Sequence, residues 1–152
     1  MADSTRTDIA TNRRAGFDYE ILDRFEAGVV LTGSEVKSLR QGSAQIAESF
    51  VKLTRLGADI VNLTIPPYEM GGHFNHEPRQ TRRLLLHKAE IDKLRKGTEQ
   101  KGMTIIPTKI YFKDGRAKIE IALGKGKKTV DKRNTIAERE SKRRLDRVMK
   151  ER

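Results

Sequence analysis

The 152-residue sequence contains no cysteine and no tryptophan, and only 5% of its residues are aromatic. Without cysteine, the chain can form neither a disulfide nor a thiolate metal site. With so few aromatic rings, a hydrophobic core must be built mainly from aliphatic side chains. A chain of this length suits one domain with a modest core.

Long hydrophobic runs are also missing. No segment approaches the roughly 18 consecutive apolar residues that a membrane-spanning helix needs. Residues 1–14 are polar and charged, and they lack the apolar stretch of a secretion signal. We therefore expect a cytoplasmic protein with no membrane partner.

Acidic residues are fewer than basic ones. The sequence contains 21 Asp and Glu and 32 Lys and Arg, which give a net charge of +11. Residues 124–152 hold 12 basic and 5 acidic residues (+7), whereas residues 1–123 hold 20 and 16 (+4). Such an excess favours a polyanionic partner, since each neutralised phosphate releases condensed counterions. The alternative is a basic surface that binds nothing in particular. The pattern predicts a globular body, residues 1–124, and a basic tail, residues 125–152.

Alternation of apolar and polar residues indicates strands through most of the body. The six expected segments are 17–21, 25–31, 47–53, 59–65, 103–112 and 116–123. The break at residues 22–24 indicates a bulge or bend between the first two segments. Asp114-Gly115, between the last two, is a strong hairpin turn signal. Many short strands with few helices predict a small closed barrel.

Two short helices interrupt the strands. Thr32 and Glu35 have capping-box spacing and precede a helix over residues 34–40. A second helix is expected over residues 87–96, with Gly97 as its C-terminal cap. In the tail, residues from Asn134 onward favour a helix, but its apolar stripe is thin. Because a short polar helix is marginal in water, we expect the tail to be disordered when free and to order on a partner.

Two apparent ligand motifs fail on spacing. Residues 124–129 resemble a phosphate-binding loop, but Ile121 stands where that loop needs its first glycine and Lys128 where it needs a hydroxyl. His73 and His76 lack a third and fourth metal ligand of obvious spacing. We expect this histidine loop to pack on the barrel or to touch RNA, and we expect no metal and no cofactor.

No arrangement of a nucleophile with its base is visible in the sequence. Asp18, Glu20 and Glu26 alternate along one expected strand, which leaves a general acid–base pair open and keeps a hydrolase as an alternative. A solvated sheet face gives the same pattern. We therefore predict that the protein is not an enzyme.

Basic clusters fall in loops, at strand ends and in the tail. They are Arg13-Arg14 and residues 79–83, 113–118 and 125–133. Guanidinium groups bind phosphates in a bidentate manner, and lysines act as point charges. Because exposed aromatic residues are few, serial base stacking on single strands is disfavoured. Recognition of folded RNA by shape and backbone fits better, although the charge pattern does not separate RNA from DNA and a generic single-strand binder stays an alternative.

Seven short strings resemble the SsrA-binding protein (SmpB) family, in that family's order. They are Asn12-Arg13-Arg14-Ala15, Asp18-Tyr19-Glu20-Ile21, Phe25-Glu26-Ala27-Gly28, Gly33-Ser34-Glu35-Val36-Lys37-Ser38-Leu39-Arg40, Asn75-His76-Glu77-Pro78-Arg79, Arg83-Leu84-Leu85-Leu86-His87 and Gly126-Lys127-Lys128 with Asp131-Lys132-Arg133. The resemblance covers about residues 12–149. It implies a mainly β fold: an antiparallel β-barrel of the oligonucleotide-binding (OB) type with short flanking α-helices and a basic C-terminal tail.

The resemblance also implies a function. It predicts an RNA-binding adaptor that binds the tRNA-like domain of transfer-messenger RNA and delivers it to the A site of stalled ribosomes, for trans-translation and rescue. The tail is expected to lie as a helix in the empty messenger channel, against small-subunit rRNA. We expect a monomer in solution.

Candidate site residues follow from the resemblance and from the basic clusters. The RNA-binding set is Asn12, Arg13, Arg14, Glu26, Lys37, Arg79, Arg82, Arg83, Leu85, Lys118, Lys125, Lys127 and Lys128. The set for the decoding centre and messenger channel is Asp131, Lys132, Arg133, Val148 and Met149. Glu26 is expected to accept hydrogen bonds from base or sugar donors, with a surface ion pair as the alternative. Leu85 is either an RNA contact or part of the core.

Two positions depart from the family pattern. Val130 stands where the family usually has histidine or an aromatic residue, and it cannot stack on a base. Gly16-Phe17 replaces what is often a basic residue followed by histidine. Both changes alter particular contacts with RNA.

Overall fold

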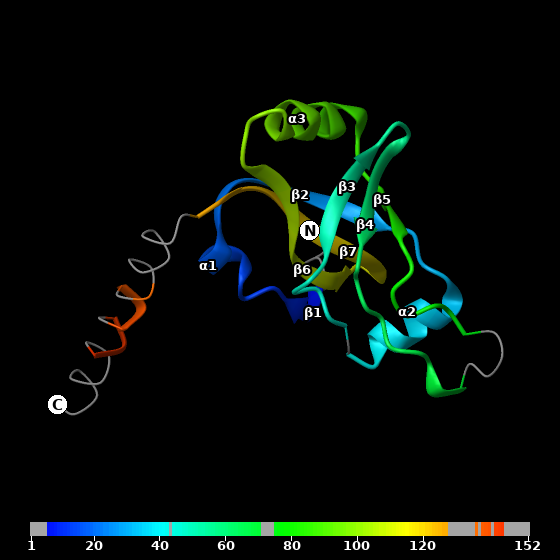
Figure 1. The fold of residues 1–152 in the computed structure, drawn as a ribbon. Coiled ribbons are helices and arrows are strands. Elements are labelled where there is room, and N and C mark those ends of the chain that lie inside the picture. Colours follow the sequence, from blue (N-terminus) through cyan, green and yellow to red (C-terminus); the bar gives the residue numbers. More distant parts are fainter. Residues whose placement is uncertain are drawn as a thin grey trace, which may run out of the picture.

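The computed structural model describes residues 6–42, 44–70, 75–127, 136, 138–140 and 142–144. Strands dominate the part of the chain that it describes (Figure 1). In chain order the elements are β1 (Arg6–Thr11), α1 (Ala15–Asp18), β2 (Tyr19–Val29), α2 (Gly33–Arg40), β3 (Phe50–Thr54), β4 (Gly57–Val61), β5 (Arg82–Leu85), α3 (Lys88–Thr98), β6 (Met103–Lys113) and β7 (Arg116–Gly126).

The strands close into an antiparallel barrel. Strand β6 pairs with β7 along its whole length, and it also pairs with β1 and, through Val51 opposite Ile105, with β3. From β3 the ladder runs through β4, β5 and β2 back to β7. Helix α3 lies across one end of the barrel and α2 near the other (Figure 1). The expected OB-type antiparallel barrel with short flanking helices is confirmed.

Three local predictions are also confirmed. The register of β2 against β7 shifts between Ile21 and Asp23, which is the bulge expected from the broken alternation. Asp114 and Gly115 both have positive φ, 52° and 80°, as a two-residue hairpin turn requires. Thr32 caps α2 through the capping box that its spacing with Glu35 predicts.

Other predictions differ from the structure. Strands β1 and β5 were not expected, and Phe17 lies in helix α1 rather than at the start of a strand. Gly97 lies inside α3, which continues to Thr98, so it is not the cap. Strand β7 runs to Gly126, two residues past the expected end of the body. It continues because Gly126 pairs with Tyr19 of β2, and this backbone pairing does not depend on whether the side chains there are polar.

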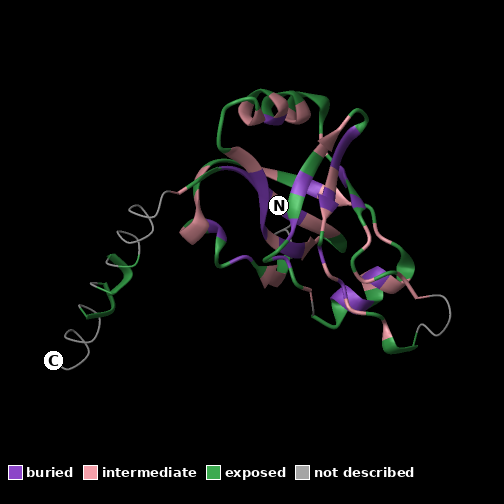
Figure 2. Cartoon of the chain, viewed as in Figure 1, coloured by how far each residue is buried: buried purple, intermediate pink, exposed green. Residues whose placement is uncertain are grey.

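The core is aliphatic, as the shortage of aromatic residues predicts. Figure 2 shows that much of the buried part of the chain lies along the strands of the barrel. Its fully buried side chains include Ile60, Leu63, Ile65, Leu94, Ile110, Ile119 and Ile121. Within the described ranges, no helix is both long enough and apolar enough to cross a bilayer.

Candidate nucleic-acid interface

Strands β2, β7, β6 and β1 present a polar face on the outside of the barrel. Residues directly opposite each other in neighbouring strands point to the same side of a sheet. Glu26 lies opposite Glu120, Lys118 lies opposite Tyr111, and Tyr111 lies opposite Asp8. The alternate positions are the buried ones, such as Ala27 and Ile119. The charged side chains of the four strands therefore share one surface.

Four of the expected RNA-binding residues come together in one groove. Glu26 of β2, Arg83 and Leu85 of β5, and Lys118 of β7 all line it, although about 90 residues of sequence separate the first from the last. Leu85 is 58% exposed, so the alternative that it belongs to the core is wrong. We call this feature the Glu26 groove; the exposed Leu56 of the β3–β4 turn and His87 line it as well.

Glu26 has both an ion pair and a side-chain hydrogen bond. The hydroxyl of Tyr111 donates to its Oε2 at 2.5 Å, and Lys113 Nζ lies 3.4 Å from the same oxygen. The hydrogen bond from Tyr111, more than the nearby lysines, holds the pKa of Glu26 below its ordinary value. The carboxylate thus stays ionised and can accept hydrogen bonds.

A second group of cations surrounds helix α1. Arg13 and Arg14 are exposed where the chain enters this helix. Lys127 donates from its backbone N–H to Asp18 O and from its Nζ to Gly16 O, both at 2.9 Å, which fastens the end of the body to α1. Tyr19 at this end of β2 is seven residues from Glu26, or about 23 Å along an extended strand. The α1 group, which also includes exposed Lys125, is thus separate from the Glu26 groove.

Asn12 does not present its side chain to solvent. It is 9% exposed, its Nδ2 donates to Pro107 O at 3.0 Å, and its backbone N–H donates to Thr108 O at 2.7 Å. This corrects the expectation of a surface contact with RNA. The side chain instead anchors the turn that carries Arg13 and Arg14.

Two further cations are exposed outside the Glu26 groove. Lys37 on α2 places its Nζ 5.6 Å from the centre of the Tyr68 ring. Arg79 lies before β5, with one guanidinium nitrogen 3.7 Å from Glu48 and Nε 3.3 Å from the hydroxyl of Thr64. Both can meet a phosphate, but neither is among the residues that line the groove.

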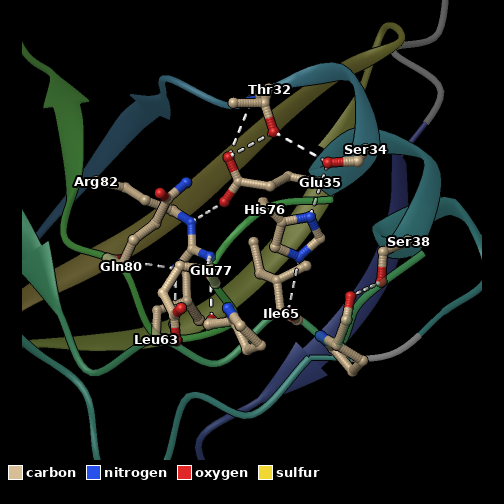
Figure 3. Close-up of polar contacts among 12 residues, drawn as sticks. Thr32, Ser34, Glu35, Ser38, Leu63, Ile65, His76, Glu77, Gln80 and Arg82 are labelled. Atoms are coloured by element: carbon tan, nitrogen blue, oxygen red, sulfur yellow. Dashed lines mark hydrogen bonds and ion pairs between the residues drawn. The ribbon is translucent and has the colours of Figure 1, made fainter. Parts of the chain in front are cut away.

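The structure contradicts the expectation that Arg82 is an RNA-binding residue. The sequence places it among RNA-binding cations, but the structure buries it, with 3% exposed, in an ion pair with Glu35 (Figure 3). The guanidinium also donates to the carbonyl oxygens of Leu63, Glu77, Pro78 and Gln80. Because an arginine has five N–H donors and all five are used inside the protein, none is left for a phosphate.

The partner of Arg82 also caps a helix. Glu35 accepts from the backbone N–H of Thr32 at 2.9 Å (Figure 3). Burial raises the pKa of Glu35, but the hydrogen bonds from Thr32 and Arg82 outweigh it and hold the pKa below the ordinary value. His76, also drawn there, lies 2.9 Å from both the hydroxyl of Ser34 and the carbonyl of Ile65, so this histidine packs on the body. His73 lies outside the described residues, and the described part contains no cluster of three metal-ligating side chains.

Six candidate residues lie outside the described residues. They are Lys128, Asp131, Lys132, Arg133, Val148 and Met149. Their roles stay predictions. Beyond Lys127, the described tail residues are 136, 138–140 and 142–144, and they are helical.

Sequence reasoning missed Tyr111 and Arg6, which both contribute to the polar face beside Glu26. Arg6 places its guanidinium carbon 3.9 Å from the centre of the Tyr111 ring. One signal was available for Tyr111, because it alternates with Lys109 and Lys113 and therefore falls on the polar side of its strand. Nothing in the sequence indicates that Arg6 reaches the same place, since β1 owes its position to pairing with β6.

Comparison with known proteins gives a consistent result. The sequence matches the model of the SmpB protein family over residues 9–151. The SsrA-binding protein of Pelotomaculum thermopropionicum is 52% identical over 144 residues, which cover 95% of this chain and 94% of that protein. That of Streptomyces coelicolor is 51% identical over 141 residues, covering 93% and 89%.

A solved structure agrees with the sequence relatives. A chain described under "tmRNA-SmpB: a journey to the center of the bacterial ribosome" is 47% identical, has a TM-score of 0.68 and covers 81% of this chain and 87% of its own length. The resemblance drawn from the seven strings is thereby confirmed. With a family match that spans nearly the whole sequence and relatives near 50% identity, the chain belongs to the SmpB protein family.

Proposed function

We propose that this protein is the RNA-binding adaptor that binds the tRNA-like domain of transfer-messenger RNA and delivers it to the A site of stalled ribosomes, for trans-translation and rescue. The observation that carries the proposal is the Glu26 groove, which gathers a carboxylate, an exposed leucine and two cations on the barrel of an SmpB-family protein. The names of its relatives, which refer to SsrA binding, tmRNA and the ribosome, support the same reading.

Each side chain of the groove has a distinct chemical use. Lys118 and Arg83 supply positive charge for phosphates, while Leu85 offers an apolar surface to a base or a ribose. Glu26 repels phosphates and accepts from base or 2′-hydroxyl donors, which gives the groove a preference for RNA over a bare polyanion. The cations around α1, together with Lys37 and Arg79, extend the charged surface and contact the RNA backbone.

The protein acts in the cytoplasm as a monomeric adaptor and carries no catalytic activity of its own. The tail residues beyond Lys127 form the arm that follows the messenger channel, with Asp131, Lys132 and Arg133 at the decoding centre and Val148 and Met149 docked near the end of the arm. The net charge of +7 on residues 124–152 suits this environment, because rRNA supplies the field that attracts the arm.

The direct test is the affinity of purified protein for a transcript of the tRNA-like domain. Lys118→Glu should weaken binding by about tenfold or more and reduce the slope of log Kd against log salt by about 1 or more, because a phosphate contact is lost. Lys93→Glu is the charge-matched control. Lys93 is exposed and lies two positions from Ile91, or about 200° around the helix, so it points away from the groove that Ile91 lines.

Competition separates this adaptor from a generic single-strand binder. Unstructured oligonucleotide of equal length should displace the folded transcript poorly, because recognition by shape and backbone needs a folded surface and few aromatic side chains are present to stack on single-stranded bases. If the oligonucleotide competes as well as the transcript does, or if the wild-type protein fails to bind the transcript at low salt, the proposed function is wrong.

A further inference from the structure

Tyr111 is buried although it lies on the polar face of the barrel. Only 2% of it is exposed, yet its cross-strand neighbours on that face are the charged residues Asp8 and Lys118. Arg6 covers its ring at 3.9 Å and is itself held by an ion pair with Asp8 at 2.9 Å. A phenol ring stacked under a guanidinium has little freedom to turn, so the direction of its hydroxyl is set by strands β1 and β6.

The hydroxyl points at Glu26. It donates to Oε2 of that carboxylate across 2.5 Å and joins β6 to β2 over the intervening strand β7. Burial and the neighbouring carboxylate raise the pKa of Tyr111 above its ordinary value. The phenol therefore keeps its proton and acts as a permanent donor.

Glu26 still has acceptor capacity after these contacts. An ionised carboxylate offers about four lone-pair positions. Tyr111 uses one of them, while Lys113 lies at 3.4 and 3.5 Å from the two oxygens. The side chain is 38% exposed and lines the groove together with Leu85 and Lys118. A ligand donor in the groove can thus reach a carboxylate that is already oriented.

We propose that Tyr111 is a positioning residue of the RNA-binding groove, whose hydroxyl fixes the Glu26 carboxylate in the orientation that accepts hydrogen bonds from a base or ribose donor of the RNA. Arg6 contributes to this positioning, because its guanidinium covers the ring of Tyr111 and shields it from water. This inference rests on the proposed function, since it assumes that Glu26 faces RNA. A glutamate held before binding does not lose rotamer freedom when the RNA arrives, and affinity rises accordingly.

A double-mutant cycle tests the inference with the transcript of the tRNA-like domain. Tyr111→Phe removes the hydroxyl and keeps the ring under Arg6, and it should raise Kd about three- to tenfold by freeing one side chain. Glu26→Gln should raise Kd at least as much. The double variant should bind no more weakly than Glu26→Gln alone, because Tyr111 acts through Glu26. Tyr68→Phe is the matched control, since the hydroxyl of Tyr68 contacts Met70 in the loop that follows β4.

A carboxyl-carbon NMR titration of the free protein gives an independent readout. In Tyr111→Phe the pKa of Glu26 should rise toward its ordinary value, because the largest influence that lowers it is gone. Lys113 on β6 and Lys118 on β7 remain to lower it, and Arg6 on β1 is nearby. Glu120, opposite Glu26 on β7 and paired with Arg24, must be assigned separately. A merely structural effect of the mutation would leave the Glu26 titration where it was.

The outcomes separate this inference from the function on which it rests. If Glu26→Gln weakens binding but Tyr111→Phe does not, or if the two effects multiply, Tyr111 does not position Glu26. If Glu26→Gln binds as tightly as wild type, both this inference and the assignment of Glu26 to the RNA surface are wrong. An unchanged Glu26 pKa in Tyr111→Phe also overturns the inference, whatever the affinity.

Discussion

At Arg82 and Lys118 two cations that look alike in the sequence lie in opposite environments. Arg82 has five donors satisfied by one carboxylate and four carbonyl oxygens, and it is 3% exposed. Lys118 lines the Glu26 groove on the outside of the barrel. The difference lies in the partner, because Glu35 faces inward from α2 and a buried carboxylate needs a cation beside it. A basic cluster in a sequence therefore holds both buried structural residues and groove-lining residues, and only the fold can separate them.

The first prediction concerns this buried pair. Arg82→Met should lower the free energy of unfolding by about 3–5 kcal/mol, because it leaves Glu35 charged and buried without its partner. The next residue is the control, since the pair of Arg83 with Asp59 spans 3.7 Å and the side chain of Arg83 is 48% exposed. Arg83→Met should cost less than about 1 kcal/mol. Urea unfolding measures both, and equal losses of stability would contradict the assignment.

At the scale of elements, the sequence predicts the strands whose pairing is local in the chain and misses the strands that form by pairing with distant segments. The β6–β7 hairpin could be predicted because its turn and both alternations lie within one stretch of chain. Strand β5 could not, because its inward positions are Arg82 and Leu84, and a buried arginine breaks the apolar pattern. Strand β1 carries a weak pattern and forms because the far edge of β6 is open to it. The Glu26 groove depends on β5, which explains why its residues could be proposed singly but not as a group.

Gly97 is a second element-scale case, because it lies within helix α3, where alanine would ordinarily be the better residue. A Cβ at this position would lie 2.3 Å from one methyl carbon of Leu123 and 3.2 Å from its Cγ. Leu123 is 6% exposed, so rotating it away would disturb the core. The glycine thus lets α3 approach β7 closely.

The second prediction follows from this close approach. Gly97→Ala should destabilise the protein by about 1–2 kcal/mol, because the cost of overpacking exceeds the gain in helix propensity. Gly16→Ala in α1 is the control, since no atom lies within 4 Å of a Cβ there. Thermal unfolding measures both variants. A Gly97→Ala protein as stable as wild type would mean that Leu123 repacks freely.

For the molecule as a whole, we propose that the body and the tail have separate functions. The groove belongs to the barrel, and the cations around α1 lie where the tail begins, because Lys127 is fastened to Gly16 and Asp18. Binding to the tRNA-like domain should therefore need the body, whereas the step on the ribosome should need the tail. The net charge of the tail could be predicted from the sequence alone. The contact of Lys127 with α1 could not, since residues 125–128 carry no signal for it.

The third prediction tests this division by deleting residues 132–152, which removes 9 basic and 4 acidic residues. The truncated protein should bind the tRNA-like transcript within about threefold of wild type at 0.15 M salt, since the groove is intact and distant charges are screened there. It should fail to support tagging of stalled chains in a reconstituted translation reaction. Full-length Lys118→Glu should instead weaken binding and tagging together. Tagging by the truncated protein at the wild-type rate would mean that the barrel alone completes delivery, and the basic tail would then need another role.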